Sequence, residues 1–324
     1  MTAGLDDVVH NRPILVAGAH RTGTTWVGKM LSAGGEAAYI SEPLNVLHHP
    51  GLLNIPIRYW YTYICAENEH EYLPALQELL GFNYQVWAGL KSVHSRKDFL
   101  RMGRDNWTFL QGKIHHQLPL LKDPFASFSI PWFLQKLGCQ VVVTVRHPAA
   151  FASSLKRLTW PFQFCDLIDQ PLLMRDWLEP YREDIESLLG EERRTGQVDI
   201  ISQASLLWRI VYAVLIHFRQ KFPEIHIVRH EDLSLDPVTG YKTLYKALGL
   251  NFTPAAQKII LESSSSDNPK EASSQNAFDV KVDSRANLEI WKRRLSTQEI
   301  LRIRAITEDI AAVYYPDLDW DYSP

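Results

Sequence analysis

Residues 14–26, Ile14-Leu-Val-Ala-Gly-Ala-His-Arg-Thr-Gly-Thr-Thr-Trp26, decide the fold that this sequence predicts. Residues 14–17 are an apolar run, typical of a strand buried on both faces. The chain turns at Gly18, and residues 24–31 then repeat apolar side chains at helical spacing. The first N–H groups of a helix have no internal partner and lie at the positive end of the helix dipole. A strand, a glycine turn and a helix N-terminus therefore form a site for an anion.

The side chains of this stretch suit a phosphate group. Gly23 lets the backbone approach closely, Thr24 and Thr25 supply hydroxyls, and Arg21 supplies a charged, forked donor. The spacing from Gly18 to Gly23 matches the glycines of Gly-x-x-x-x-Gly-Lys-[Ser/Thr], but Thr24 stands where that motif needs lysine. We therefore expect a loop that holds phosphate without hydrolysing a γ-phosphate. The alternative is an ordinary glycine-rich connection between a strand and a helix.

Length and composition fit a single α/β domain over residues 1–324. Of the 324 residues 46% are hydrophobic, enough for a large core with helical additions. The net charge of −3 gives no general basic field, so nucleic acid is a poor candidate partner.

The cysteines and the N-terminal residues indicate the compartment. Cys65, Cys139 and Cys165 are odd in number and widely spaced, so they predict neither a metal site nor a disulfide framework. That usage fits a reducing compartment, and we expect a cytoplasmic protein. Residues 1–12 lack the apolar core of a signal peptide, and no run of about 18 apolar residues predicts a transmembrane segment.

Strands and helices alternate along the rest of the chain. Further strands are expected at residues 37–40, 119–122, 140–145 and 225–228. Helices are expected at residues 70–81, 105–118, 149–157, 166–195, 204–222, 237–248 and, after the capping box Ser296-Thr-Gln-Glu299, up to residue 315. The alternation predicts a parallel sheet with helices on both faces and ligands at the carboxyl ends of the strands.

Three segments are expected to add to this frame. Residues 47–120 and 158–200 are predicted insertions on the substrate side, and the helix at 166–195 is expected to lie over the sheet as a cap. Residues 263–280 are rich in serine and asparagine, which favours a mobile loop, and we extend this cofactor or substrate loop to residues 263–290.

Four polar side chains follow predicted strands: Arg21, Glu42, Lys122 and Arg146. The carboxyl ends of parallel strands share one sheet edge, so these side chains are expected to meet. Ser154 lies eight residues after Arg146 on the following helix, and the two could hold a second phosphate. Alternatively, Arg146 pairs with a carboxylate and Ser154 is a small packing residue.

Four motifs now resemble those of the PAPS-dependent sulfotransferases, in family order from residue 14 to residue 315. Arg21-Thr-Gly-Thr-Thr-Trp26 resembles the family's 5′-phosphosulfate loop, and Val145-Arg-His-Pro-Ala-Ala-Phe-Ala-Ser-Ser154 its 3′-phosphate motif. Arg229-His-Glu-Asp-Leu233 is similar to the family's Tyr-Glu-Asp-Leu, and Trp291-Lys-Arg-Arg-Leu-Ser296 to its Trp-Lys-x-x-Leu-Ser. The resemblance implies the P-loop-like sulfotransferase fold.

Departures from the usual motifs point to one branch of that family. Arg21 replaces the loop lysine, as in carbohydrate and tyrosylprotein sulfotransferases, and Ser41-Glu-Pro-Leu44 resembles the carbohydrate branch. Phenol and steroid enzymes carry a base histidine that is missing from Lys122-Asp123-Pro124. The chain lacks the anchor and the cysteines of Golgi enzymes, so the resemblance points to a soluble bacterial relative.

The reaction that the resemblance implies is sulfuryl transfer from PAPS to a hydroxyl group, without a metal. Such a transfer needs a base, cations at the leaving oxygen, and alignment. Glu42 would be the base, and Arg21 and Lys122 would stabilise the leaving group. The residues expected to bind the nucleotide are Arg21, Thr22, Gly23, Thr24, Thr25, Trp26, Arg146, Ser154, His230 (against adenine) and Arg285.

Other interpretations of the sequence stay open. The Glu-Pro-Leu motif favours a sugar or glycolipid hydroxyl as the acceptor, while aromatic residues in the insertions allow a lipid or polyketide acyl-chain hydroxyl. A P-loop-type kinase and a non-catalytic nucleotide-binding module are the rivals from other classes. The histidine pairs at residues 48–49 and 115–116 are expected at the surface or in packing, and Glu231 is expected to be structural. His20 is a candidate to assist catalysis.

Overall fold

Five parallel strands form one sheet in a computed structural model that describes residues 12–273, 279–315 and 320. In spatial order they are β2 (Ala37–Ser41), β3 (Leu118–Lys122), β1 (Ile14–Ala17), β4 (Gln140–Val145) and β5 (His226–Arg229). The buried run that opens the chain is thus the central strand, and its neighbours are β3 and β4. This arrangement confirms the α/β class with a parallel sheet flanked by helices.

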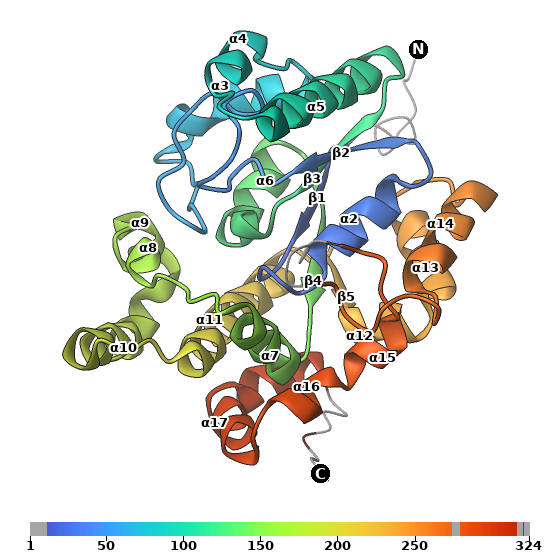
Figure 1. Ribbon diagram of the computed structural model, residues 1–324. Coiled ribbons are helices and arrows are strands. Elements are labelled where there is room, and N and C mark those ends of the chain that lie inside the picture. Colours follow the sequence, from blue (N-terminus) through green and yellow to red (C-terminus); the bar gives the residue numbers. More distant parts are fainter. Residues whose placement is uncertain (1–11, 274–278, 316–319, 321–324) are drawn as a thin grey trace.

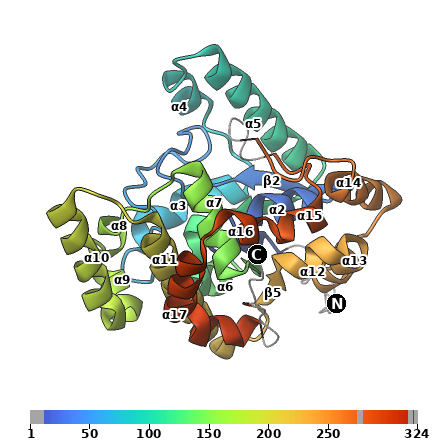
Figure 2. The same ribbon diagram turned by 60° about the horizontal axis from the view of Figure 1, so that its bottom comes forward.

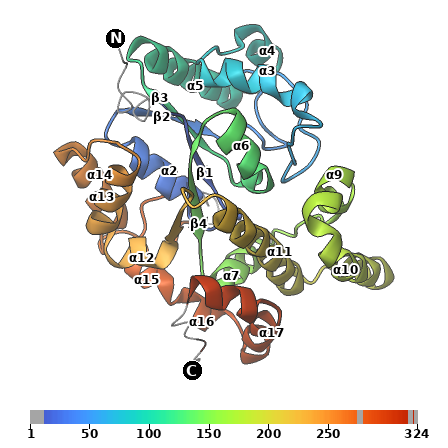
Figure 3. The same ribbon diagram turned by 180° about the vertical axis from the view of Figure 1, so that it is seen from behind.

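Side chains alternate along the strands, so each face of the sheet has its own hydrophobic core. On one face Ile14 and Val16 pack with α2 (Thr24–Ser32), α13 (Pro237–Ala247) and α14 (Pro254–Ser264). On the other face Leu15 packs under α6 (Ile130–Lys136), α7 (Pro148–Leu158), α11 (Ile200–Lys221) and α17 (Thr297–Tyr314). Figures 1 and 3 show the two groups of helices on opposite sides of the strands.

The remaining helices belong to insertions and connections. Between β2 and β3 lie α3 (Glu69–Leu80), α4 (Val86–Lys91) and α5 (Arg96–Ile114), and α5 contacts β2. The 3₁₀ helix η1 (Pro124–Ser129) follows β3. The short α12 (His230–Leu235), α15 (Ser284–Leu288) and α16 (Ile290–Arg294) lie near the end of the chain. In Figure 2, α4 and α5 project away from the sheet.

The expected helix at residues 105–118 is wrong at both ends, because α5 begins at Arg96 and stops at Ile114. The side chain of Ser95 accepts a hydrogen bond from the Asp98 N–H at 3.2 Å, which caps the helix nine residues earlier than expected. His116, at φ 50°, then turns the chain into β3.

The single helix expected at residues 166–195 is also wrong. Pro171 and Pro180 start new turns, and the segment divides into α8 (Cys165–Ile168), α9 (Pro171–Leu173), a π-helical turn (Met174–Leu178), a 3₁₀ turn (Glu179–Tyr181) and α10 (Arg182–Thr195). It does not cap the sheet: α10 contacts α11 and α8, and Figure 1 shows it at the edge of the molecule. Only Ile185 of α10 is buried.

Within the described residues, α11 is the one helix long and apolar enough to cross a membrane. It is a core helix, since 72% of its most apolar window is buried inside the protein. The capping box predicted at the start of the last helix is present: Ser296 accepts from the Glu299 N–H, and the Glu299 carboxylate accepts from the Ser296 N–H at 2.8 Å.

Candidate active site

The ends of β2 and β3 bring Glu42 and Lys122 together. Ser41 pairs with Lys122 in the sheet, and the Glu42 N–H donates to the Lys122 carbonyl at 2.7 Å. The Lys122 ammonium then forms an ion pair with Glu42 Oε1, while Asn45 Nδ2 donates to Glu42 Oε2 at 2.6 Å. Glu42 itself adopts φ 50°, uncommon for a residue other than glycine. Both carboxylate oxygens are therefore held, and the carboxylate has a fixed orientation.

The loop after β1 is anchored from three sides. The Gly18 N–H donates to Ser127 Oγ at 3.0 Å, the Ala19 N–H to the Tyr212 hydroxyl at 3.3 Å, and the His20 N–H to the Tyr61 hydroxyl at 3.1 Å. Gly18 has φ 124°, and a Cβ there would lie 2.4 Å from the Thr144 carbonyl. A glycine is required at the turn because any side chain would push β1 and β4 apart.

The loop ends at the N-terminus of α2, where Gly23 has φ 96°. A Cβ on Gly23 would lie 2.7 Å from His230 Nδ1, so the loop and α12 also need a glycine at their contact. Among the described residues no side chain caps this helix, and its first turn contains no acidic residue. Thr24 and Thr25 face a cavity, so the positive helix terminus is open to an anion there.

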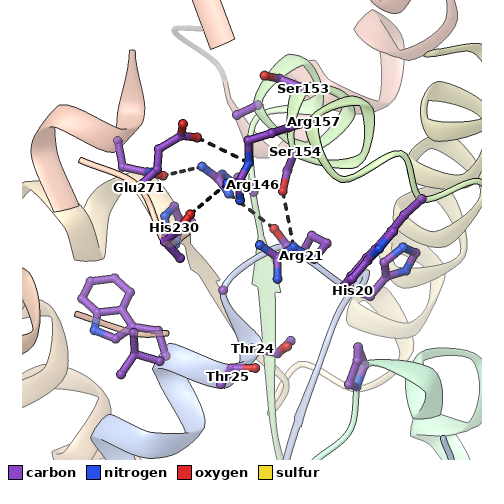
Figure 4. A pocket seen from close by; sticks show the side chains of 18 of the residues that line it. His20, Arg21, Thr24, Thr25, Arg146, Ser153, Ser154, Arg157, His230 and Glu271 are labelled. Carbon is purple, nitrogen blue, oxygen red and sulfur yellow. Dashed lines mark hydrogen bonds and ion pairs between the residues drawn. The ribbon is translucent and has the colours of Figure 1, made fainter. Parts of the chain in front are cut away.

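Three arginines surround this helix terminus. Arg21 Nε donates to Ser154 Oγ at 3.3 Å, and Arg146 Nη1 donates to the Arg21 carbonyl at 3.4 Å. Arg146 Nη2 also donates to Asn287 Oδ1 at 2.7 Å. Arg157 lies on the same α7 face as Ser154, and Figure 4 shows these side chains converging above the loop. The two predicted phosphate motifs thus meet in space.

Burial and crowding oppose these positive charges. Burial, with the nearby charges of Arg146 and Arg157, lowers the pKa of Arg21 to about 10. Burial also lowers the pKa of Arg146, although the Glu231 carboxylate partly offsets it. Like charges held this close would be stabilised by a bound anion, so the cluster is suited to one.

One cavity of about 590 Å³ joins the arginine cluster to Glu42. Part of its wall is cationic, with Arg21, Arg146 and Arg157. The apolar end of the wall is formed by Leu47, Trp60, Phe125 and Phe162, whereas Trp160 lies against Arg21, whose guanidinium carbon is 5.6 Å from the centre of the Trp160 ring. A charged group and an apolar or ring-shaped group can therefore occupy the two ends at once, with Glu42 beside the space between them.

A family model described as the sulfotransferase family matches residues 13–254. The chain belongs to the sulfotransferase family. Its reaction class is therefore sulfuryl transfer, and the loop and sheet above are the nucleotide-binding core of that fold. Among curated proteins none matches the sequence.

Solved sulfotransferase structures resemble the chain at low identity. The sulfotransferase domain from the curacin biosynthetic pathway is 15% identical, with 91% of this chain and 96% of that chain covered and a TM-score of 0.45. The domain from the Synechococcus PCC 7002 olefin synthase is 17% identical, with 96% and 98% covered and a TM-score of 0.47. Mouse sulfotransferase SULT7A1 complexed with PAP is 11% identical, with 94% and 84% covered and a TM-score of 0.40.

Two histidines of the sulfotransferase site are partly buried and have lowered pKa values. Burial, with the Arg21 charge, lowers the pKa of His20 to about 3, and His20 Nδ1 lies 2.9 Å from the Tyr61 hydroxyl. Burial and Arg146 lower the pKa of His230 well below its usual value. Trp26 meets the His230 ring edge-on at 5.6 Å between centroids. His230 Nδ1 has no hydrogen-bond partner among the described residues and packs against Gly23.

Three predicted site residues do not present their side chains to the cavity. Thr22 is buried, and its hydroxyl lies 2.8 Å from Thr144 Oγ1. Arg285 Nη2 donates to the Leu235 carbonyl at 2.6 Å and lies outside the cavity wall. Lys122 is 2% exposed and contacts the cavity only through Glu42. The other predicted residues line the cavity together: Arg21, Gly23, Thr24, Thr25, Trp26, Glu42, Arg146, Ser154 and His230.

Sequence reasoning missed several cavity residues. Arg157 follows Ser154 by three residues, so helical spacing could have placed it on the same face. Arg294 ends the Trp-Lys-Arg-Arg motif and donates to Ser153 Oγ at 3.1 Å and to Glu271 Oε2 at 2.6 Å. Glu271 also lies 3.8 Å from Arg157 Nε, and no sequence signal marked it.

Two further expectations concern Glu231 and the loop at residues 263–280. Glu231 holds the loop after β4: it accepts from the His147 N–H at 2.9 Å and from the Tyr315 hydroxyl at 2.7 Å, which confirms its structural role. The predicted loop at 263–280 begins within α14, which ends at Ser264, and residues 274–278 lie outside the described residues. Among the described residues no three histidine, cysteine or acidic side chains group as metal ligands.

Proposed function

We propose that this sulfotransferase moves the sulfuryl group of PAPS to a hydroxyl acceptor and releases 3′,5′-ADP. The observation that carries the proposal is the junction of two cationic phosphate sites in one cavity with a fixed carboxylate. A donor with separate phosphate groups at its 3′ and 5′ positions matches two such sites. Family membership supports the same donor, and a mouse relative was solved with PAP bound.

The geometry supports one orientation of the donor. The 5′-phosphosulfate would lie at the α2 N-terminus, where Gly23, Thr24 and Thr25 meet Arg21. The 3′-phosphate would lie against Arg146 and Ser154, with Arg157 close by. The base would then lie near Trp26 and His230, which both line the cavity.

Glu42 is the proposed general base. In the reaction the acceptor oxygen forms a bond to sulfur while the bond from sulfur to the bridging phosphate oxygen breaks. The acceptor proton passes to Glu42, and the leaving oxygen keeps the bonding electron pair next to Arg21 and the α2 N–H groups. His20 is a weaker candidate, because a ring with a pKa of about 3 has little basicity at neutral pH.

We propose a different role for Lys122 from the one that the sequence suggested. Its ammonium contacts Glu42 and is buried, so we propose that it orients the base, while Arg21 stabilises the leaving group. Both tasks need a cation at the carboxyl edge of the sheet, and Lys122 and Arg21 each supply one.

The acceptor is proposed to be a sugar or glycolipid hydroxyl, with a lipid or polyketide acyl-chain hydroxyl as the alternative. The apolar end of the cavity, with Trp60, Phe125 and Phe162, suits the face of a sugar ring as well as an acyl chain. The three free cysteines support the expected cytoplasmic location. The absence of a lysine at Thr24 argues against a P-loop-type kinase.

Calorimetry with nucleotides tests the donor. We expect 3′,5′-ADP to bind more tightly than 5′-AMP by about 1.5–3 kcal/mol, the contribution of a charged hydrogen bond. Arg146→Ala should remove most of this difference. Arg182→Ala is the matched control, because its guanidinium pairs with Glu179 outside the cavity and its loss should leave both affinities unchanged. Equal affinity of the wild type for the two nucleotides would refute the assignment of PAPS.

A screen for sulfated products tests the acceptor. The enzyme is incubated with PAPS and representatives of sugars, glycolipids and hydroxyacyl compounds, and mass spectrometry detects the added sulfuryl group. A parallel incubation with ATP and magnesium tests the kinase alternative, which phosphorylated product would support.

A further inference from the structure

An apolar stripe on α5 faces solvent instead of the protein. Phe99, Leu100, Trp107, Leu110 and Ile114 are all exposed. At 3.6 residues per turn, these five positions fall within an arc of about 100°. The buried residues of the same helix, Phe109 and Gly112, lie on the opposite side. An amphipathic helix normally buries such a stripe, so here the apolar stripe lacks its usual cover.

The neighbouring helix extends this surface. On α4, Trp87 is 79% exposed, and Val86 and Leu90 are also exposed. The two helices contact each other, since Gly89 of α4 lies against Met102 of α5. We name the exposed residues Val86, Trp87, Leu90, Phe99, Leu100, Trp107, Leu110 and Ile114 the α4–α5 face. Figure 2 shows α4 and α5 standing clear of the other helices.

The charge of this segment differs from that of the rest of the chain. Residues 86–116 contain six lysines and arginines and two aspartates, a net charge of +4, whereas the whole chain has −3. Lys91, Arg96, Lys97, Arg104 and Lys113 are exposed around the apolar stripe. The basic charge therefore surrounds aromatic and aliphatic side chains on a protein that is otherwise acidic.

We propose that the α4–α5 face docks on the surface of a membrane that contains anionic lipids. Helices that lie in the membrane interface typically expose tryptophan and leucine beside lysine and arginine. The apolar side chains enter the boundary of the acyl chains, and the cations meet the lipid phosphates. The rest of the protein is acidic and would be repelled by an anionic membrane. The charge distribution therefore also sets the orientation in which the protein docks.

The position of the face relative to the cavity supports this occupant over a protein partner. The loop from Asn45 to Leu53 connects the two: Leu47 lines the cavity and is 77% exposed, and the Gly51 carbonyl accepts from the Gln85 N–H at 2.9 Å, just before α4. Docking would place this loop near the lipid surface. An acceptor held in the membrane could then reach the apolar end of the cavity; this last step rests on the proposed function, and the docking itself does not.

Cosedimentation with vesicles tests the docking without any substrate. We expect the full chain to bind vesicles of phosphatidylcholine with phosphatidylglycerol, to bind pure phosphatidylcholine at least tenfold more weakly, and to be released by high salt. Replacement of Trp87, Leu100 and Trp107 by serine should lower binding at least tenfold. These side chains are exposed, so the variant should still fold, and retained 3′,5′-ADP affinity checks that it does.

Two control variants change the same kinds of exposed side chain on other helices. Leu301→Ser with Val313→Ser removes exposed apolar side chains from α17, and should leave vesicle binding unchanged. Lys91→Glu with Lys97→Glu should abolish the preference for anionic lipid, whereas Lys242→Glu with Lys246→Glu on α13 should keep it. No binding by the wild type, or equal loss in test and control variants, would overturn the proposal. A wild-type dimer in ultracentrifugation that the serine variant dissociates, without vesicle binding, would instead assign the face to self-association.

Discussion

Glu42 combines a strained backbone with the proposed role of general base. Its positive φ has an energetic cost, and the Lys122 ammonium and the Asn45 amide hold its two oxygens. Glu42→Gln keeps the shape and removes the basicity. We expect turnover to fall by about 10²–10⁴, the usual range for a positioned base, with 3′,5′-ADP affinity nearly unchanged. Steady-state kinetics and calorimetry measure the two quantities.

The control for this substitution is Glu36→Gln. Glu36 precedes β2 and accepts from the Asn251 N–H at 2.7 Å, far from the cavity wall, so its loss should leave turnover unchanged. Normal turnover by the Glu42→Gln enzyme would mean that the base is another group, and His20 would be the next residue to replace.

The lowered pKa values of His20 and His230 predict how stability depends on pH. In the unfolded chain each binds a proton as the pH falls through about 6.5. In the folded protein His20 stays neutral down to about pH 3, and the pKa of His230 is also well below its usual value. The unfolded state therefore takes up more protons in this window, and the free energy of unfolding decreases as the pH falls. Replacement of both histidines by asparagine should make this decrease shallower between pH 6.5 and 4, as urea unfolding would show; an unchanged slope would contradict the burial of neutral rings.

Single residues of the site were predictable when a motif carried them. Arg21, Glu42 and Arg146 follow strands, and their meeting at one sheet edge follows from parallel topology. Glu271 was not predictable, because its contact with Arg294 joins two segments whose approach depends on the packing of α15 and α16.

At the scale of elements, the sequence predicted the strands well and the insertion helices less well. Strands buried on both faces have a strong apolar signal, so β1 and β4 match residue for residue. The start of α5 depends on the Ser95 cap, a signal outside the apolar pattern. The exposed stripe of α5 also resembles the pattern of a buried helix face, which is why periodicity alone could not show that it faces solvent.

The segment between α14 and α17 is predicted to respond to the nucleotide. Asn287 donates to the Lys270 carbonyl at 2.9 Å and accepts from Arg146, so α15 is linked to the proposed 3′-phosphate site. We expect 3′,5′-ADP to slow hydrogen exchange across residues 265–273 and 279–290, because the ligand ties this segment to the loop of Arg21. Residues 182–195 of α10 serve as the internal control. Unchanged exchange in 279–290 would count against closure of this segment over the donor.

At the scale of the whole molecule, the cavity joins residues that are distant in sequence, from His20 to Arg294. A ligand that bridges them binds the folded state only. At a concentration of 100 times its dissociation constant, 3′,5′-ADP should raise the free energy of unfolding by about 2.7 kcal/mol, seen as a higher midpoint in a thermal scan. The Arg146→Ala protein should show a smaller rise at the same concentration, and a wild-type midpoint insensitive to the nucleotide would argue against a bridging site.

The proposed donor site and part of the apolar end of the cavity come from different segments of the chain. The loop of Arg21 follows β1 and Arg146 follows β4, whereas Leu47 and Trp60 lie between β2 and β3. The apolar positions are therefore suited to acceptor redesign. A library confined to Leu47, Trp60 and Phe162 would vary the apolar end of the cavity and leave Asn45, Tyr61 and every arginine of the proposed nucleotide site in place. Variants from this library should acquire new acceptor preferences while keeping one shared donor.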